Sequence, residues 1–169
     1  MKIIGLYGWS GSGKTDLICR LLKKFSTFLN VSTIKHTHHN VTIDKEDKDS
    51  FKHKVSGAKE IMIWGGHNWA LIHNGNDNEN IVLDDLCNKF SKETDLLIIE
   101  GLKDGNFPKI EVYNSKLKRE IICKKNSSTI ALVYDKIDKK ISDINLPIFE
   151  FSETEKISDF IINFLKIKK

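Results

Sequence analysis

The sequence predicts an α/β protein with a doubly wound, mostly parallel sheet and helices on both faces. Apolar runs of strand length alternate along the chain with segments whose apolar residues recur at helical spacing. Residues 95–100, Asp-Leu-Leu-Ile-Ile-Glu, are apolar between two acids, which is typical of a central parallel strand buried on both faces. A glycine-rich segment joins the first apolar run to the first helical pattern. In this fold class, ligands bind beyond the carboxyl ends of the strands.

The first third of the chain is predicted to form a strand, a loop, a helix and a second strand. Residues 3–7 are a short apolar run followed by glycine, and residues 17–25 carry apolar side chains at helical spacing. Residues 31–34 are the second strand candidate. A polar region follows, and we expect helical character from about Asp49 onward.

The rest of the chain continues this alternation. Residues 60–64 and 69–73 are β-prone runs around Gly65-Gly66-His67-Asn68, which predicts a hairpin or a strand–loop–strand connection. The remaining predicted elements are a helix near residues 82–90, strands at 108–113 and 129–134, and a closing helix at 157–165. Residues 152–155, Ser-Glu-Thr-Glu, have the form of a capping box for that helix. Because no repeat or linker divides the sequence, we expect a single domain over residues 1–169.

Composition excludes several classes of protein. The chain has 169 residues, of which 40% are hydrophobic and 30% charged, too apolar for a disordered chain and too interrupted for a membrane protein. No apolar run has the length of a signal-peptide core or a spanning helix, so we expect a cytoplasmic location. The 3 cysteines are widely spaced and form no CxxC pair, which indicates reduced packing residues.

The distribution of charge argues against nucleic-acid binding. Of 27 basic residues only Arg20 and Arg119 are arginines, and the lysines are interspersed with 23 acids. A nucleic-acid footprint would be a clustered basic stripe with arginine to read bases. We therefore expect neither a nucleic-acid nor a membrane partner.

Residues 8–15, Gly-Trp-Ser-Gly-Ser-Gly-Lys-Thr, match the GxxxxGK[ST] motif of P-loop NTPases. The motif lies between the first predicted strand and helix, where backbone amides can surround phosphate oxygens at the helix N-terminus. Lys14 is expected on the β and γ phosphates and Thr15 on Mg²⁺, while the Trp9 ring could cover the site. The predicted nucleotide-binding residues are Gly8, Ser10, Gly11, Ser12, Gly13, Lys14 and Thr15. The alternative is a glycine-rich turn with a surface lysine.

Three acids are candidates for contacts with the metal and the base. Glu100 ends the most apolar strand and is best placed as the second metal-side carboxylate, the alternative being a solvated strand-end acid. Residues 135–138, Asp-Lys-Ile-Asp, approach the NKxD motif with which many GTPases read guanine. A carboxylate can accept hydrogen bonds from both guanine donors, so Asp135 and Asp138 are candidates for the base, the alternative being an ordinary polar loop.

A histidine-rich motif follows the second predicted strand at the ligand-binding edge. Residues 35–39 are Lys-His-Thr-His-His, which could contact an anionic or heterocyclic ligand, bind a metal, or form a polar loop. No fourth ligand at a recognisable spacing accompanies a metal site there. The acidic run that follows contains Asp44 and Asp49, and acids near phosphate would act through a metal ion or water.

The chain resembles a known family, the P-loop GTP-binding protein B of molybdopterin-guanine dinucleotide biosynthesis (MobB). The motifs that carry the resemblance are residues 8–15, 35–39, 48–50, 56–58, 95–103 and 108–110. The Lys-His-Thr-His-His motif at residues 35–39, followed by the EGxK motif at residues 100–103 (Glu-Gly-Leu-Lys), is far more specific than the P-loop alone. One departure is that Glu46-Asp47 stands where the family usually has Pro-Gly, which removes a turn glycine and adds charge.

This resemblance implies a dimeric protein that binds GTP with Mg²⁺ and has at most weak GTPase activity. It would assist the separate guanylyltransferase of molybdenum cofactor biosynthesis that forms molybdopterin guanine dinucleotide. Phosphate-site roles carry over to Gly11, Gly13, Lys14 and Thr15, and positions near metal or pterin to Asp44, Asp49 and Glu100. Candidate contacts with molybdopterin or a partner are Lys35, His36, His38, His39, Asp49 and Lys103.

Two other functions share the P-loop. A small-molecule or nucleotide kinase usually relies on arginines over the migrating phosphoryl group, and this chain has only Arg20, expected to point away, and Arg119. A switch GTPase needs intact NKxD and DxxG motifs, and neither is intact here. Both observations favour the accessory GTP-binding protein.

Overall fold

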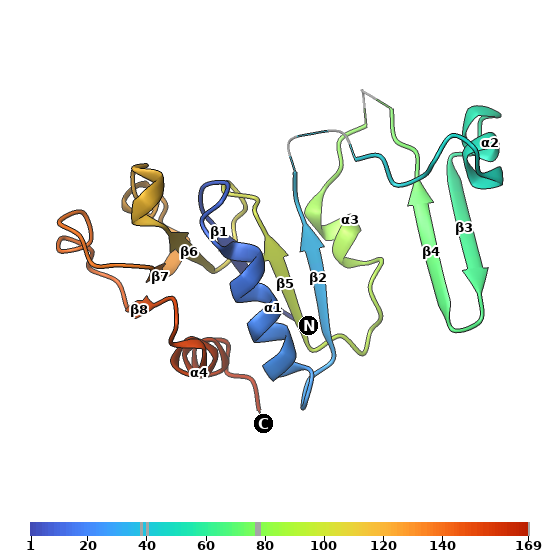
Figure 1. Ribbon diagram of the computed structural model, residues 1–169. Coiled ribbons are helices and arrows are strands. Elements are labelled where there is room, and N and C mark those ends of the chain that lie inside the picture. Colours follow the sequence, from blue (N-terminus) through green and yellow to red (C-terminus); the bar gives the residue numbers. More distant parts are fainter. Residues whose placement is uncertain (38, 40, 77–78, 169) are drawn as a thin grey trace. The chain divides into compact units, whose positions relative to one another are not determined.

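The computed structural model describes all residues except 38, 40, 77–78 and 169 (Figure 1). The chain folds into two compact units, the first made of Met1–Thr37 and Phe90–Lys169 and the second of His38–Lys89. The single domain predicted over residues 1–169 stays a prediction. None of the helices in the described part of the chain has the length and apolar character needed to cross a bilayer.

The first unit is built on a six-stranded sheet in which all neighbouring strands are parallel. Its strands are β1 (Lys2–Tyr7), β2 (Val31–Lys35), β5 (Leu96–Glu100), β6 (Lys109–Tyr113), β7 (Thr129–Tyr134) and β8 (Ile148–Glu150). Their order in space is β2-β5-β1-β6-β7-β8, so the chain crosses from one side of β1 to the other between β5 and β6. Such a switch point is where open α/β sheets bind ligands. The predicted parallel fold is confirmed.

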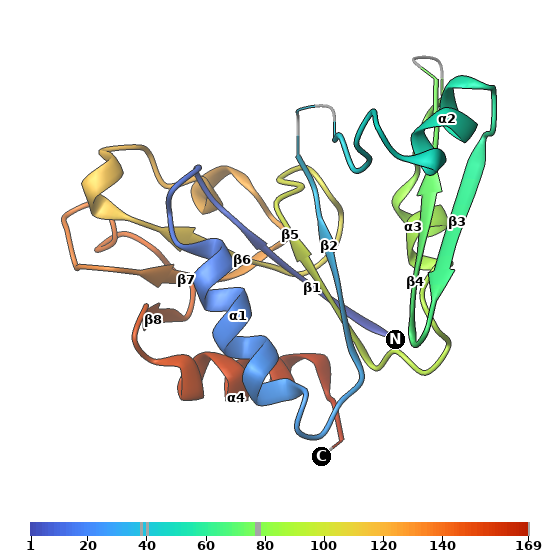
Figure 2. The same ribbon diagram turned by 45° about the vertical axis from the view of Figure 1, so that its right-hand side comes forward.

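Helices α1 (Lys14–Phe25) and α4 (Thr154–Leu165) pack over one face of this sheet (Figure 2). The apolar stripe predicted for α1 is buried there, and Leu17, Leu21 and Phe25 are 0% exposed. Burying one such side chain contributes about 1.5–3 kcal/mol, so this interior fixes α1 against the sheet. Arg20 points toward α4, where it donates to the Phe151 carbonyl at 2.8 Å and to Thr154.

The other face of the sheet over β6 and β7 is covered by loops and by the 3-10 helix η2 (Cys123–Lys125), which contributes Cys123. A further 3-10 helix, η1 (Ser115–Leu117), follows the carboxyl end of β6. A second cluster of buried side chains lies on this face and comprises Tyr113, Ile121, Cys123, Leu132, Tyr134 and Ile141. Both faces thus carry helical segments, α-helices on one and a 3-10 turn on the other.

Two details of the carboxyl-terminal third differ from the sequence prediction. The sequence analysis does not predict the edge strand β8, which has only three residues, Ile-Phe-Glu, and is too short for a recognisable strand pattern. The prediction of a capping box at residues 152–155 is wrong. Helix α4 begins at Thr154, its N-cap is Glu153, and no side chain caps it. Glu153 instead accepts a hydrogen bond from the Glu150 amide at 3.0 Å and pairs with Lys156, so it stabilises the turn before the helix.

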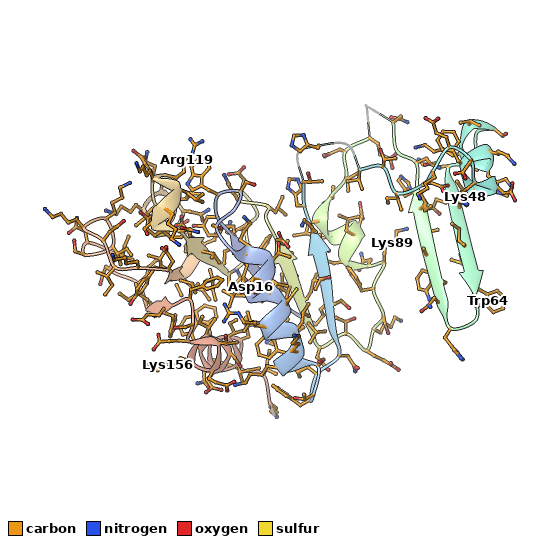
Figure 3. The ribbon with its side chains drawn as sticks, in the orientation of Figure 1. Asp16, Lys48, Trp64, Lys89, Arg119 and Lys156 are labelled. Carbon is orange, nitrogen blue, oxygen red and sulfur yellow. The ribbon has the colours of Figure 1, made fainter. Side chains whose placement is uncertain are left out.

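The second unit contains the predicted hairpin. Its elements are α2 (Asp49–Val55), β3 (Glu60–Gly65), β4 (Asn68–His73) and α3 (Leu83–Cys87). Strands β3 and β4 pair antiparallel, with Trp64 opposite Trp69 and Glu60 opposite His73. Of the hairpin side chains, Ile61 and Ile72 are buried. Both tryptophans are instead exposed, Trp64 at 78% and Trp69 at 62%, so the hairpin has an uncovered apolar surface (Figure 3).

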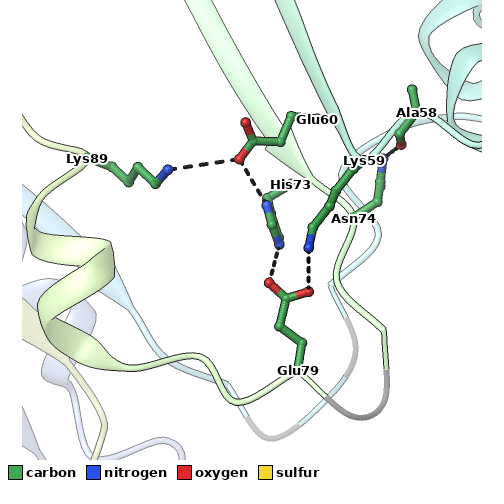
Figure 4. A network of polar contacts seen from close by, with 7 residues as sticks. All are labelled: Ala58, Lys59, Glu60, His73, Asn74, Glu79 and Lys89. Carbon is green, nitrogen blue, oxygen red and sulfur yellow. Dashed lines mark hydrogen bonds and ion pairs between the residues drawn. The ribbon is translucent and has the colours of Figure 1, made fainter.

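A polar network fastens the base of this hairpin (Figure 4). The His73 ring lies between two carboxylates, with Nδ1 3.0 Å from Glu60 Oε1 and Nε2 2.8 Å from Glu79 Oε1. Lys59 pairs with Glu79 and Lys89 with Glu60. Both ring nitrogens can donate only when the imidazole is protonated. Hydrogen bonds to Glu60 and then Glu79 therefore raise the pKa of His73, and the same bonds lower the pKa of each carboxyl group.

His73→Gln is expected to flatten the pH dependence of thermal stability above about pH 6.5. The raised pKa of His73 means that its contribution is complete below the unfolded-state pKa and is lost as pH rises through the folded-state pKa. The lowered carboxyl pKa values act oppositely, so their contribution is lost in acid. Melting temperatures of both proteins between about pH 5 and about pH 9 test this, with His67→Gln in the turn as control. Parallel curves for wild type and His73→Gln would contradict it.

Candidate functional site

The loop between β1 and α1 has the backbone shape of a phosphate cradle. Gly8, Gly11 and Gly13 all have positive φ angles, of 144°, 77° and 99°. A Cβ on Gly8 would lie 2.3 Å from the Val112 carbonyl oxygen, so no larger residue fits without movement. Ser12 Oγ is buried without a hydrogen-bond partner among the described residues. A buried hydroxyl without a partner, in a loop that leads into a helix N-terminus, is suited to donate a hydrogen bond to an anionic oxygen.

Lys14 is held at the centre of this loop. Its Nζ donates to the Trp9 carbonyl at 2.8 Å, so the ammonium lies against the loop that carries it. Burial lowers the pKa of Lys14; Lys103 and Lys35 act in the same direction, while Glu100 raises it. Several cations therefore surround one site, and a bound anion would relieve their mutual repulsion.

Thr15 and Glu100 meet at the ends of neighbouring parallel strands. Leu6 of β1 is in register with Glu100 of β5, so Glu100 emerges next to the loop that follows β1. The Thr15 hydroxyl donates to Glu100 Oε1 at 2.8 Å, and Lys35 Nζ lies 3.5 Å from the same oxygen. Hydroxyl and carboxylate oxygens are hard donors of the kind that Mg²⁺ prefers beside phosphate. The structure thus brings these two predicted metal-side residues together, and their binding of Mg²⁺ stays a prediction.

Trp9 is the centre of a cationic cluster that the sequence reasoning missed. Lys103 Nζ lies 4.1 Å from the centre of the indole ring and Arg119 Cζ 5.3 Å from it. The indole N–H donates to the Glu120 carbonyl at 2.8 Å. Arg119 follows η1 and Lys103 follows β5, and Figure 3 shows Arg119 near the end of the sheet from which the phosphate loop emerges. The separation of these residues in sequence left no motif that could have linked them.

The two acids proposed for guanine already have partners within the protein. Asp135 accepts hydrogen bonds from the Ser115 amide at 2.7 Å and from the Ser115 hydroxyl at 3.0 Å. Asp138 accepts from the Tyr113 hydroxyl at 2.7 Å and from the Lys140 amide at 2.8 Å. The Tyr113 bond is the largest cause of the lowered pKa of Asp138. Both carboxylates order the loops beyond β6 and β7, and their contact with a base stays a prediction.

The remaining predicted residues are divided between the units. The His36 amide donates to the Glu100 carbonyl at 2.9 Å, which keeps the end of β2 beside β5. His38 lies outside the described residues. His39, Asp44 and Asp49 belong to the second unit, where Asp44 Oδ1 accepts from the Lys45 amide and Asp49 pairs with Lys52. Their roles toward metal, pterin or partner stay predictions.

The chain is similar to one protein family over most of its length. The sequence model of that family, molybdopterin guanine dinucleotide synthesis protein B (MobB), matches residues 3–135. The molybdopterin-guanine dinucleotide biosynthesis adapter protein of Haemophilus influenzae is 32% identical over 169 residues, which covers 98% of this chain and 90% of the relative. The adapter protein of the same name from Escherichia coli is 27% identical, with 98% and 94% covered.

Solved structures extend the similarity to the whole fold. The crystal structure of Bacillus subtilis MobB superposes with a TM-score of 0.78 at 28% identity, covering 99% of this chain and 100% of the other. The MobB protein homolog from Bacillus stearothermophilus gives a TM-score of 0.73 over 99% of this chain and 100% of the other. At 17% identity the latter is a likeness in fold alone.

Gly8→Ala is expected to lower the melting temperature, because the new methyl group meets the Val112 carbonyl at a backbone angle that side chains avoid. Strain of this kind costs about 1–3 kcal/mol, or about 2–4 °C per kcal/mol for a chain of this length. Gly65→Ala is the matched control, since a Cβ there meets nothing within 4 Å. Thermal denaturation checks both, and equal melting temperatures for the two variants would refute the close approach at Gly8.

Proposed function

Because the chain belongs to the molybdopterin guanine dinucleotide synthesis protein B (MobB) family, we propose that it is the GTP-binding adapter of molybdenum cofactor biosynthesis. In that role it assists the guanylyltransferase that forms molybdopterin guanine dinucleotide. The observation that carries the proposal is the Thr15–Glu100 hydrogen bond beside Lys14 in a glycine-rich loop. A cytoplasmic location is part of the proposal.

The protein's own residues account for nucleotide binding at this site. The amides at the start of α1 and the Lys14 ammonium bind the phosphates, and the cations around Trp9 add positive charge at the same edge of the sheet. Thr15 and Glu100 would hold Mg²⁺, which neutralises phosphate charge when bound. Guanine selectivity is part of the proposal and is assigned to the loop that carries Asp135 and Asp138.

The geometry gives no support to the kinase alternative. Arg20 is engaged with Asp16, Phe151 and Thr154 on the α4 side of the first unit. Arg119 lies beside Trp9, and its Cζ is 5.3 Å from the ring centre. Phosphoryl transfer is usually served by cationic side chains clamped on the moving group, and Arg119 is the one of these two arginines that lies beside the phosphate loop.

We propose that the protein is a homodimer in which the β3–β4 hairpin contributes to the interface. The chain offers an uncovered apolar patch there, with Met62 63%, Trp64 78% and Trp69 62% exposed on one face of the hairpin. Tryptophans so exposed are enriched where proteins meet. We propose that this patch binds the same patch of a second copy of the chain. Lys35, His36 and Lys103 in the first unit are proposed as contacts for molybdopterin, for which Lys35 and Lys103 supply positive charge.

GTP with Mg²⁺ is expected to raise the melting temperature more than ATP with Mg²⁺. Binding to the folded state stabilises it by about 2.7 kcal/mol at a ligand concentration of about 100 times Kd. Lys14→Ala should abolish the shift, because it removes the cation that contacts the loop, whereas Lys23→Ala near the end of the same helix should retain it. Differential scanning fluorimetry measures all three proteins. Equal shifts with both nucleotides would refute guanine selectivity, and a shift retained by Lys14→Ala would remove the loop from the proposal.

Trp64→Glu is expected to shift the protein from dimer toward monomer, because a charge in the apolar patch must be desolvated on association. Ile137→Glu is the matched control, since Ile137 is 65% exposed but lies in the loop after β7. Sedimentation equilibrium at several concentrations gives the mass of each protein. A wild-type monomer, or a dimer that tolerates Trp64→Glu, would contradict the assignment of the hairpin.

A further inference from the structure

Two buried charged side chains on β6 have no place in the phosphate site described above. Lys109 is 1% exposed and Glu111 is 0% exposed. Because side chains alternate along a strand, both project from the face of the sheet opposite to Ile110 and Val112, which pack in the cluster with α1. A buried charge is costly unless polar groups compensate it. Here backbone groups of two separate loops provide the compensation.

Lys109 fastens the β5–β6 loop (residues 101–108). Its Nζ donates to the Lys103 carbonyl at 2.6 Å and to the Gly105 carbonyl at 2.5 Å. The ammonium also lies 5.4 Å from the centre of the Phe107 ring. Space for the side chain exists because β1 has glycine at position 5, where a Cβ would lie 2.8 Å from Lys109 Cγ. The loop that carries Lys103 is thus tied by its own backbone to the middle of the sheet.

Glu111 fastens the β6–β7 segment (residues 114–128) in the complementary way. Its carboxylate accepts hydrogen bonds from the Ile122 amide at 2.9 Å and 3.0 Å and from the Cys123 amide at 2.6 Å. These amides lie at the N-terminus of η2, so the carboxylate provides the acceptor for N–H groups that have no partner within that turn. Arg119 and Glu120 precede the tied amides in the chain and are separated from them by Ile121 alone. Their position therefore depends on the Glu111 carboxylate.

The two fastened segments meet at Trp9. Lys103 comes from the segment held by Lys109, whereas Arg119 and the Glu120 carbonyl come from the segment held by Glu111. All three contact the indole, and the carbonyl of Trp9 in turn accepts the hydrogen bond from Lys14. A continuous series of contacts thus leads from the buried pair to the phosphate-binding lysine.

We propose that Lys109 and Glu111 are positioning residues of the phosphate site, which place Lys103 and Arg119 on Trp9 and thereby add two cations beside the phosphate loop. The ligand class that this arrangement fits is a polyphosphate with more negative charge than the loop alone neutralises. The inference rests on the nucleotide binding proposed above. Lys109 and Glu111 thus affect the affinity for the ligand through the residues around Trp9, without contacting the ligand themselves.

The experiment uses the full-length protein with Trp64→Phe and Trp69→Phe, so that Trp9 is the only tryptophan. Lys109→Met, Glu111→Gln and the control Lys125→Met are compared with this parent well below their melting temperatures. Lys125 is exposed and lies near Lys109 in a shallow pocket, so its removal changes the local charge equally. We expect Lys109→Met and Glu111→Gln to change Trp9 emission and to weaken GTP binding roughly tenfold, as loss of supporting residues does around metal sites. The control should change neither.

A double-mutant cycle separates positioning from general stability. If Lys109 acts through Lys103, Lys109→Met should weaken GTP binding much less when Lys103→Met is already present. Lower melting temperatures with unchanged Trp9 emission and GTP affinity, or strictly additive losses in the cycle, would overturn the inference. If Lys109→Met does not fold, Glu111→Gln decides by the same two measurements. If the parent binds no GTP, the proposed function fails, and Trp9 emission alone then supports or overturns the positioning.

Discussion

The register between β1 and β5 is the constraint on which the rest of the site depends. Leu6 lies opposite Glu100, so the phosphate loop and the strand-end carboxylate emerge at the same level of the sheet. A slip of one residue would turn Glu100 to the other face and separate it from Thr15. The apolar side chains of both strands hold this register, because those of Ile4, Leu6, Leu96 and Ile98 are all 0% exposed in one interior. Packing energy in the core thus determines the geometry of the polar edge.

The parts of the site that sequence predicts are those that local patterns encode. The loop at residues 8–15 and Glu100 follow from a contiguous motif and from the end of an apolar strand, and the structure brings Thr15 and Glu100 together. Lys109 and Glu111 could not be predicted, because they stand in a strand pattern where a buried charge is unexpected. Their compensation comes from backbone carbonyls and amides that carry no sequence signature. The prediction of a capping box is wrong for a related reason, because the Glu153 side chain accepts a hydrogen bond from the Glu150 amide in the turn before α4.

The placement of the two arginines sharpens the functional interpretation. Scarcity of arginine in the sequence argues against phosphoryl transfer, and the structure adds where each one acts. Arg20 joins α1 to the start of α4 and so contributes to the packing of the first unit. Arg119 has its Cζ 5.3 Å from the centre of the Trp9 ring, where it adds positive charge beside the phosphate loop. One arginine therefore contributes to packing and the other lies beside the proposed phosphate site, which suits the proposed nucleotide-binding adapter.

The missing side chain at Gly5 links two distant positions in a way that would appear in related sequences. A methyl group there would lie 2.5 Å from the Phe107 ring and 2.8 Å from the Lys109 stem, so a larger residue would have to displace the ring and the lysine side chain. Glycine at position 5 and lysine at position 109 should therefore vary together. A relative with a side chain at the first position should have lost the buried lysine and, with it, the anchor of the β5–β6 loop. The smallest residue of β1 thus leaves the space in which the Lys109 side chain is buried.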